Sequence, residues 1–256
     1  MENRTDKLVN IQTYFIESEK NWFETFKIHL YEKGSDSLFY TCENFAFYEY
    51  FIEKDLRSAK QNFYKHGRIT QFLTLKYNSN ILNYGMQHFS YTLLSDNRKL
   101  INDFSNLKYE NYLGESYMQA VNRGKATSMY VLQCLIKDDW SEYERVLPIF
   151  KDKFLKKNKL MEIDGIFYEA LARKDKKTME EALKELVSPK MHKKRNTMPL
   201  NNEFISHPAI GYAKLAWYKG IEVEVDSPLV PKEWLPIQPL KDEEYIDYDF
   251  VKAYLG

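Results

Sequence analysis

The chain has 256 residues, enough to bury a sizeable core in one large domain or in two closely packed halves. Its 37 basic and 37 acidic residues cancel, which excludes a global field that would attract nucleic acid or an anionic membrane. With 16% aromatic residues but only 9 Gly and 8 Pro, the composition favours long, packed helices.

The N-terminal half, residues 1–110, is predicted to be helical. Apolar residues from Leu8 onward recur at three- and four-residue steps, which predicts a helix over 6–32. We expect Gly34 to end it. A second apolar stripe, which starts at Leu38, predicts one continuous helix that closes at Gly67.

Two further helices complete this half. A stripe of apolar residues predicts a long helix over 69–93, with Gly85 tolerated inside it. A short helix is expected over 98–107. Cys42 and Cys134 lie on apolar helical stripes, so both are predicted to be buried reduced thiols.

The second half, residues 113–220, carries a weak internal repeat. Residues 135–150 align with residues 171–186 at an offset of 36, and apolar residues of one segment align with apolar residues of the other. Asp139 meets Asp175 in this alignment, at points where one helix ends and another begins. Each aspartate is therefore predicted to cap the second helix of a hairpin.

Helix pairs over 117–155 and 159–188, with one more helix over 203–219, follow from this pattern. The segment 188–201, "SPKMHKKRNTMPLN", is polar and basic, and its composition predicts a loop. The predicted fold class is all-α, with antiparallel helical hairpins packed as a bundle or as a short repeat-like array.

After Gly220 the chain changes character. Ile221, Val223 and Val225 alternate with acidic residues, a period of two that suits a short extended segment with one face on the protein. Four prolines then forbid a continuous helix. Residues 221–256 are thus predicted to form a proline-rich tail packed on the helices, which makes 1–256 a single all-α domain.

Motifs that carry chemistry are missing from the sequence. It has no glycine-rich phosphate loop, no HExxH, no CxxC and no GxSxG. The histidines are dispersed, and structural roles are expected for them, with Ser206 or His207 capping the helix that follows. We therefore predict no catalytic residue, no cofactor and no metal.

Two charged segments allow a second interpretation. The basic run from Lys190 to Arg195 has the charge to hold phosphate, but without a stacking platform it is better explained as a linker. The carboxylates of residues 222–226 and 242–249 have the chemistry for paired acid–base work, but a solvated face is the simpler interpretation.

The stretch 207–236, "HPAIGYAKLAWYKGIEVEVDSPLVPKEWLP", joins a helix, a glycine, an alternating segment and Pro-x-x-x-Leu-Pro. This combination resembles the C-terminal end of the immunity protein 49 family of bacterial polymorphic toxin systems. The turns at Leu135–Trp140 and Ala172–Lys176 also fit that family's mostly helical architecture. A second helical immunity family, the one paired with polymorphic nuclease toxins, ends in a similar way.

The resemblance implies a cytoplasmic immunity protein that binds and neutralises a cognate toxin domain by stoichiometric inhibition. It carries over no catalytic residue, and it involves neither nucleic acid nor a membrane directly. A monomer is expected. The identity and activity of the toxin stay open.

A toxin with a basic groove would be met best by acidic and aromatic residues together. Candidate partner-binding residues are Asp242, Glu243, Glu244, Tyr245, Asp247, Tyr248 and Asp249, followed by Glu222, Glu224 and Asp226. Two alternatives remain. A helical-repeat scaffold would bind an endogenous protein or peptide along a concave face, and an enzyme would have a deep pocket where carboxylates or histidines converge.

Overall fold

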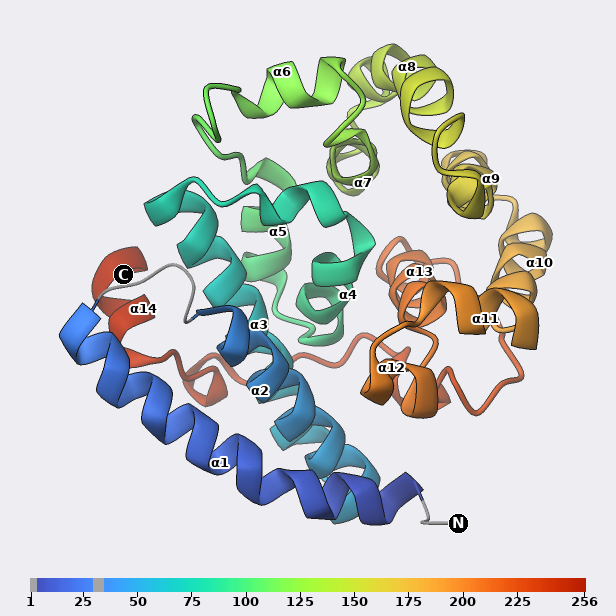
Figure 1. Cartoon of the computed structure of the whole chain (residues 1–256). Coiled ribbons are helices and arrows are strands. Elements are labelled where there is room, and N and C mark those ends of the chain that lie inside the picture. Colours follow the sequence, from blue (N-terminus) through green and yellow to red (C-terminus); the bar gives the residue numbers. More distant parts are fainter. Residues whose placement is uncertain (1–3, 30–34) are drawn as a thin grey trace.

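The computed structural model describes residues 4–29 and 35–256. In that part the chain forms fourteen α-helices with short 3₁₀ and π turns and no β-strand, which confirms the all-α prediction. Figure 1 shows α6, α8, α9 and α10 in an arc around α4, α7 and α13, with the long α1 along the opposite side.

The first half begins with α1 (Arg4–His29), which packs along α2 (Ser35–Tyr48). The predicted stop at Gly34 lies outside the described residues. The continuous helix predicted from Leu38 to Gly67 is wrong, because α2 passes into a π turn, η2 (Glu49–Glu53), and the chain then reverses.

Asp55 caps the helix that begins after the reversal. Lys54 adopts the left-handed conformation with φ 60°, and a new helix, α3 (Leu56–Tyr77), starts immediately after Asp55. The Asp55 carboxylate accepts hydrogen bonds from the backbone amides of Arg57 and Ser58 at 2.9 and 3.0 Å. These are donors that a helix start otherwise leaves unpaired.

Replacing Asp55 with Ala is expected to lower the free energy of unfolding by about 1 kcal/mol, the usual effect of losing an N-cap. Urea denaturation followed by circular dichroism measures it. The conservative change Asp55→Asn keeps an acceptor and should retain most of the stability. An alanine variant as stable as the asparagine variant would show that the cap does not hold this helix start.

The third predicted helix, 69–93, is also wrong. Helix α3 runs through Gly67 to Tyr77, and the chain turns at Asn78, whose φ is 53°. After the turn η3 (Asn80–Tyr84), Gly85 with φ 57° precedes α4 (Met86–Leu94). Gly85 therefore separates two elements instead of lying inside one, in a conformation that glycine adopts without steric cost.

Gly67 has a packing role inside α3. A Cβ atom there would lie 2.7 Å from Leu100 Cδ2 and 2.8 Å from Thr92 Oγ1. Leu100 belongs to α5 (Arg98–Asn106) and Thr92 to α4, so the missing side chain lets three helices meet closely. Gly67, which the sequence suggests as the end of a helix, instead allows α4 and α5 to pack closely against α3.

The second half contains the predicted hairpins. Asp139 accepts from the Glu142 amide at 3.2 Å and Asp175 from the Thr178 amide at 3.1 Å, so both predicted caps are confirmed. The residue before each cap, Asp138 or Lys174, has a φ of 55°, so the two turns share one geometry. The helices are α6 (Tyr117–Asn122), α7 (Thr127–Lys137), α8 (Trp140–Ile149), α9 (Glu162–Ala172) and α10 (Lys176–Leu186).

The prediction of a loop over residues 188–201 is also wrong, because much of the segment is helical. It forms α11 (Pro189–Arg195) and the start of α12 (Pro199–Phe204). Proline is favoured in the first turn of a helix because its missing amide would be unpaired there. Both prolines, which indicated a loop, in fact begin helices.

Helix α13 (His207–Tyr218) is the central helix of this half. It is buried along most of its length and packs on α4 and α10. The expected side-chain cap is not formed. Ser206 Oγ instead donates to the Leu186 carbonyl at 3.4 Å, and His207 Nε2 lies 2.8 Å from Ser90 Oγ. Ser206 and His207 therefore join helices across the core.

Beyond Gly220 the chain is extended. Val223 and Val225 are buried and Glu222, Glu224 and Asp226 are exposed, the alternation that the sequence predicts. The tail crosses the molecule and ends in a short helix, α14 (Asp249–Leu255), which packs on α3 near α1 (Figure 1). Val251 of α14 belongs to a second apolar cluster with Trp22 and Phe72.

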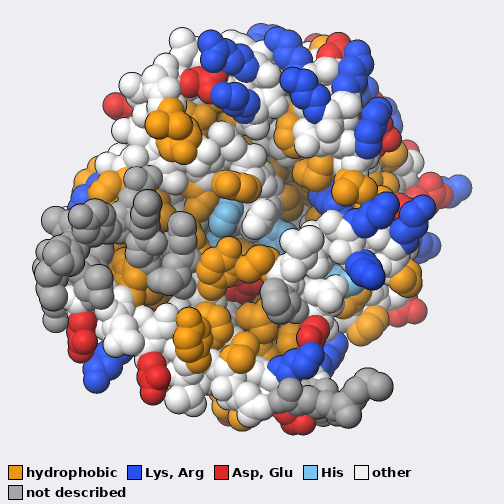
Figure 2. Space-filling view, viewed as in Figure 1, with side chains coloured by type: hydrophobic (Ala, Val, Ile, Leu, Met, Phe, Trp, Pro, Cys, Tyr) orange, Lys and Arg blue, Asp and Glu red, His pale blue; other side chains and the backbone are white. Residues whose placement is uncertain are grey.

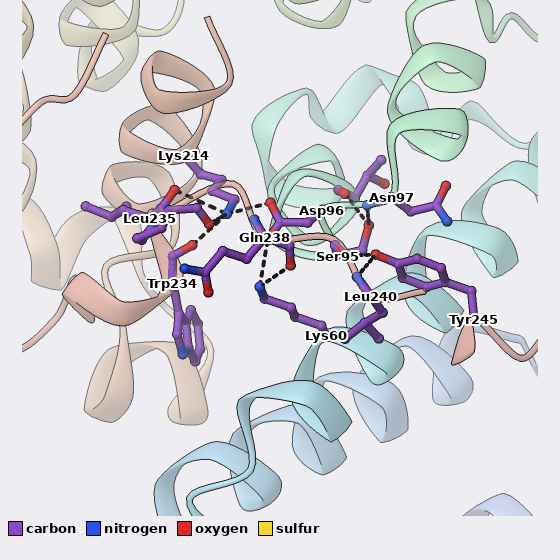
Figure 3. Close-up of polar contacts among 12 residues, drawn as sticks. Lys60, Ser95, Asp96, Asn97, Lys214, Trp234, Leu235, Gln238, Leu240 and Tyr245 are labelled. Carbon is purple, nitrogen blue, oxygen red and sulfur yellow. Dashed lines mark hydrogen bonds and ion pairs between the residues drawn. The ribbon is translucent and has the colours of Figure 1, made fainter. Parts of the chain in front are cut away.

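Two buried lysines hold the tail, as Figure 3 shows. Lys214 Nζ of α13 lies 2.6 Å from Asp96 Oδ1 and donates to the backbone carbonyls of Trp234, Leu235 and Pro236. Lys60 Nζ of α3 lies 2.8 Å from Asp96 Oδ2 and donates to the Gln238 carbonyl. We call Lys60, Asp96 and Lys214 the lysine clamp.

Candidate functional site

A pocket of about 500 Å³ opens between α2, α3, η3, α4 and α12. In Figure 2, histidine side chains and an acidic side chain lie at the bottom of a hollow ringed by hydrophobic side chains. The described lining residues are Phe39, Tyr40, Glu43, His66, Leu73, Ser79, Asn80, Ile81, Tyr84, Gln87, His88, Tyr91, Tyr112, Met198 and Asn201. Its size suits a small ligand or a projecting group of a partner.

Glu43 is the acidic residue of the pocket. It is 5% exposed, and its Oε1 atom has no hydrogen-bond partner in the described part of the chain. Burial raises the pKa of Glu43 from 4.5 to about 7, and the neighbouring Tyr91 hydroxyl offsets part of the shift. A carboxyl group in this state gains from any cation placed beside it.

Two imidazole rings form one side of the pocket. His66 and His88 are stacked with ring centroids 5.6 Å apart, and Phe39 lies 4.9 Å from the first and 5.2 Å from the second. Burial lowers the pKa of His66 well below 6.5 and that of His88 to about 3, so both rings are neutral. The Nδ1 atom of each has no hydrogen-bond partner among the described residues.

A smaller cavity of about 150 Å³ adjoins the pocket and shares part of its lining, from Tyr84 to Asn201. Arg195 lines this cavity, but its guanidinium group is bound to the buried Asp164 carboxylate at 2.7 and 3.0 Å. Tyr212 also donates a hydrogen bond to Asp164. The positive charge at this end is thus already paired inside the protein.

This pairing changes the interpretation of the basic run. Arg195 and His192 point inward, and His192 Nε2 lies 2.9 Å from the Asn202 carbonyl oxygen. Lys190, Lys193 and Lys194 stay exposed on α11. The run is a helix with a structural face rather than a linker.

The acidic tail divides into inward and outward side chains. Asp247 forms a bidentate pair with Arg68, at 2.8 to 3.1 Å, in which both side chains are largely buried. Tyr248 is buried, and its hydroxyl donates to Glu19 at 2.6 Å and lies 3.5 Å from Cys42 Sγ. These two predicted partner-binding residues attach the tail to α1, α2 and α3.

Glu244 and Tyr245 also make internal contacts. Glu244 pairs with Arg57, and the Tyr245 hydroxyl donates to the Ser95 carbonyl at 2.9 Å and accepts from the Leu240 amide. Outward-facing residues remain at Asp242, Glu243 and Asp249, with Ile246 62% exposed between them. We call these four residues the tail patch.

The second predicted set lies on the extended segment after α13. Glu222, Glu224 and Asp226 are exposed on the face opposite to the buried valines. The Glu224 amide donates to Glu180 of α10 at 2.9 Å, so the backbone is held while the carboxylates point outward. This segment presents three acidic side chains at fixed positions.

Cys42 and Cys134 are buried free thiols, as predicted, and burial raises the pKa of each to about 12. No group of three or more His, Cys, Asp and Glu side chains is arranged to hold a metal ion in residues 4–29 and 35–256. Within the same residues no helix combines the length and apolarity needed to span a bilayer.

The pocket is not among the sites predicted from the sequence. One signal was available: Glu43 lies in "LFYTCENFAFYEYF", where ten of fourteen residues are apolar or aromatic, so a helix there has little room for a solvated face. A carboxylate inside such a run is expected to be buried, and buried carboxylates are candidates for function. The other lining residues come from segments up to residue 201, which periodicity cannot bring together.

A family model described as immunity protein 49 matches residues 85–234, more than half of the chain. The match begins at Gly85, before α4, and ends at Trp234, whose carbonyl accepts from the lysine clamp. It leaves out α1 to α3 and the tail patch. No curated protein and no solved structure matches the chain.

Proposed function

The chain belongs to the immunity protein 49 family, and on this premise we propose that it binds and neutralises one cognate polymorphic toxin domain in the cytoplasm. The family match is the observation that carries the proposal. The toxin is its protein partner, and inhibition is stoichiometric. A monomer that blocks or distorts the toxin's active site is the simplest form of this activity.

The helical framework supports a preformed binding surface. Glu224, Asp247 and Tyr248 fix the tail through their internal contacts, so its outward side chains are held before a partner arrives. Holding them in advance reduces the ordering cost that binding would otherwise impose. An acidic surface of this kind complements a basic toxin groove and speeds encounter.

The direct test is rescue. The toxin domain encoded beside this gene is expressed in bacteria with and without the chain, and the purified pair is examined by size-exclusion chromatography with light scattering. We expect growth only with co-expression, and a one-to-one complex. A toxin domain that forms no complex and stays lethal would contradict the proposal.

We propose that the tail patch lies in the interface. Changing Asp242, Glu243 and Asp249 together to Lys is expected to weaken toxin binding by about tenfold or more, mainly through slower association at low salt. Surface plasmon resonance measures both rates. The matched control reverses three exposed glutamates elsewhere, Glu144, Glu181 and Glu185.

Equal dissociation constants for the two triple variants and the parent would show that the tail patch is not part of the interface. Asp247 is unsuitable for this test, because its reversal would break the buried pair with Arg68 and unfold the tail. Glu222, Glu224 and Asp226 form the second proposed contact set and are tested in the same way.

Catalysis is the second candidate, because Glu43 and two histidines meet in the pocket. We favour binding for two reasons. With pKa values well below 6.5, His66 and His88 are weak general bases, and at neutral pH neither is in the imidazolium form that acts as a general acid. The immunity protein family is also generally non-enzymatic.

A further inference from the structure

The chemistry of the pocket selects for one sign of charge. Among its described lining residues there is one carboxyl group, Glu43, and no Lys or Arg. The nearby imidazoles are neutral, and Arg195 in the adjoining cavity is paired with Asp164. An anion placed here would meet Glu43 without a counter-charge, whereas a cation would supply the one that is missing.

The aromatic residues of the lining also favour a cation. Phe39, Tyr40, Tyr84, Tyr91 and Tyr112 line the pocket, and a cation near the face of such rings is attracted by their negative charge density. Aromatic walls with one carboxylate suit a positively charged group on an apolar stem. A bare metal ion fits less well, because no three described ligand side chains are arranged for one.

Buried polar atoms without a partner complete the site. Glu43 Oε1, His66 Nδ1 and His88 Nδ1 are buried and have no partner in the described chain. An ammonium or guanidinium group carries several N–H donors and no acceptor, so it can satisfy Glu43 Oε1, and also an imidazole Nδ1 in the tautomer that carries its proton on Nε2. Glu43 and His66 are 5% and 1% exposed, so a group that reaches them is removed from water.

We propose that this pocket binds an organic cation, an ammonium or guanidinium group on an apolar stem. The cation is either a free small amine or a Lys or Arg side chain that projects from the toxin, and the second case rests on the function proposed above. Glu43 of α2, the one carboxyl group of the lining, lies outside the matched residues 85–234, as does His66 of α3.

The first experiment uses the protein alone. Ligand-observed NMR titration compares n-butylammonium and n-butylguanidinium with n-butanol and butyrate, which share the stem but differ in charge. We expect the cations to bind at least about tenfold more tightly than the alcohol or the anion. Butyrate or n-butanol binding as well as the cations would overturn the proposal.

Variants assign the effect to Glu43. Glu43→Gln keeps the shape and removes the charge, and it should weaken cation binding at least about tenfold. Glu181→Gln, an exposed glutamate on α10, is the matched control and should leave the affinity unchanged. Unchanged cation binding by a folded Glu43→Gln protein would refute the assignment.

A thermal melt shows whether Glu43→Gln folds. If it does not, Tyr84→Ala replaces it, because Tyr84 is 57% exposed and its removal leaves the core intact. This variant should weaken n-butylammonium several-fold and n-butanol little, since only the cation uses the charge density of the ring. Equal losses for both probes would count against the proposal.

The second experiment separates the two sources of the cation. If a toxin side chain enters the pocket, Glu43→Gln weakens the toxin complex at least about tenfold and n-butylguanidinium competes with the toxin. If the toxin affinity is unchanged while the small cations still bind, the ligand is a free amine. If the parent protein does not bind the toxin, the immunity function is contradicted. The cation titrations would still show whether the pocket binds an organic cation.

Discussion

Replacing Asp96 with Asn is expected to lower the free energy of unfolding by about 3–5 kcal/mol, the usual result of breaking a buried ion pair from one side. Asp96 is 1% exposed, and its carboxylate lies between Lys60 and Lys214, which are 3% and 0% exposed. Burial already lowers the pKa of Lys214 to about 8 although Asp96 raises it. Without Asp96, two buried ammonium groups have no counter-charge.

Asparagine is the right replacement because Asp96 has a φ of 57°, a conformation that Asn tolerates better than Ala does. Guanidinium denaturation measures the loss. Asp152→Asn is the matched control, since Asp152 pairs with Lys156 on the surface and should be nearly silent. Similar losses for the two variants would show that the lysine clamp is no more important than a surface pair.

Acidification is expected to destabilise the protein by about 3 kcal/mol or more between pH 7 and pH 4. Burial lowers the pKa of His207 from 6.5 to about 4, so the folded protein binds fewer protons than the unfolded chain in this range. Its contribution to stability is complete above pH 6.5 and is lost as the pH falls toward 4. At about 1.36 kcal/mol per pKa unit, the shift of His207 by itself corresponds to about 3 kcal/mol.

Other buried groups change the size of this effect. His66 and His88 act in the same direction as His207, because burial lowers the pKa of each. Glu43 acts in the opposite direction: its raised pKa of about 7 gives a contribution that is complete below pH 4.5 and lost as the pH rises through 7. Glu43→Gln should therefore make the loss on acidification steeper.

Denaturation curves at several pH values test this expectation. His207→Gln should be less stable at pH 7, because the contact with Ser90 Oγ is altered, but its stability should fall less on acidification. The imidazole signal of His207 in NMR should titrate near pH 4. A signal that titrates near pH 6.5 would contradict the assignment.

Local patterns predicted much of the helical structure but not its interruptions. The caps at Asp139 and Asp175 could be predicted because each depends on a few consecutive residues. The break at Asp55 could not, because the apolar spacing continues through it and only the reversed packing of α3 on α2 decides it. The loop predicted from Pro189 and Pro199 was wrong for another reason, because proline suits both a loop and the first turn of a helix.

The sequence could not show which of the predicted contact residues are paired inside the protein. Acidic residues at 242–249 look alike in the sequence, yet Asp247 has a buried Arg68 beside it and Asp242 does not. Arg68 is 179 positions away, and no spacing rule reveals such a pair. The pocket is hidden in the same way, because Glu43 and Asn201 meet only after the chain has closed.

The tail also constrains the order of folding during synthesis. A ribosome adds Tyr248 and Val251 after every earlier helix, yet these residues complete the apolar cluster that contains Trp22 and Phe72. Domains tend to fold from the N-terminus as they emerge. Helices α1 and α3 can pack on earlier helices, but the side of the cluster that Tyr248 and Val251 cover stays open to water until α14 has left the exit tunnel. A chain cut short before Tyr248 would carry an exposed apolar surface, which protein quality control recognises.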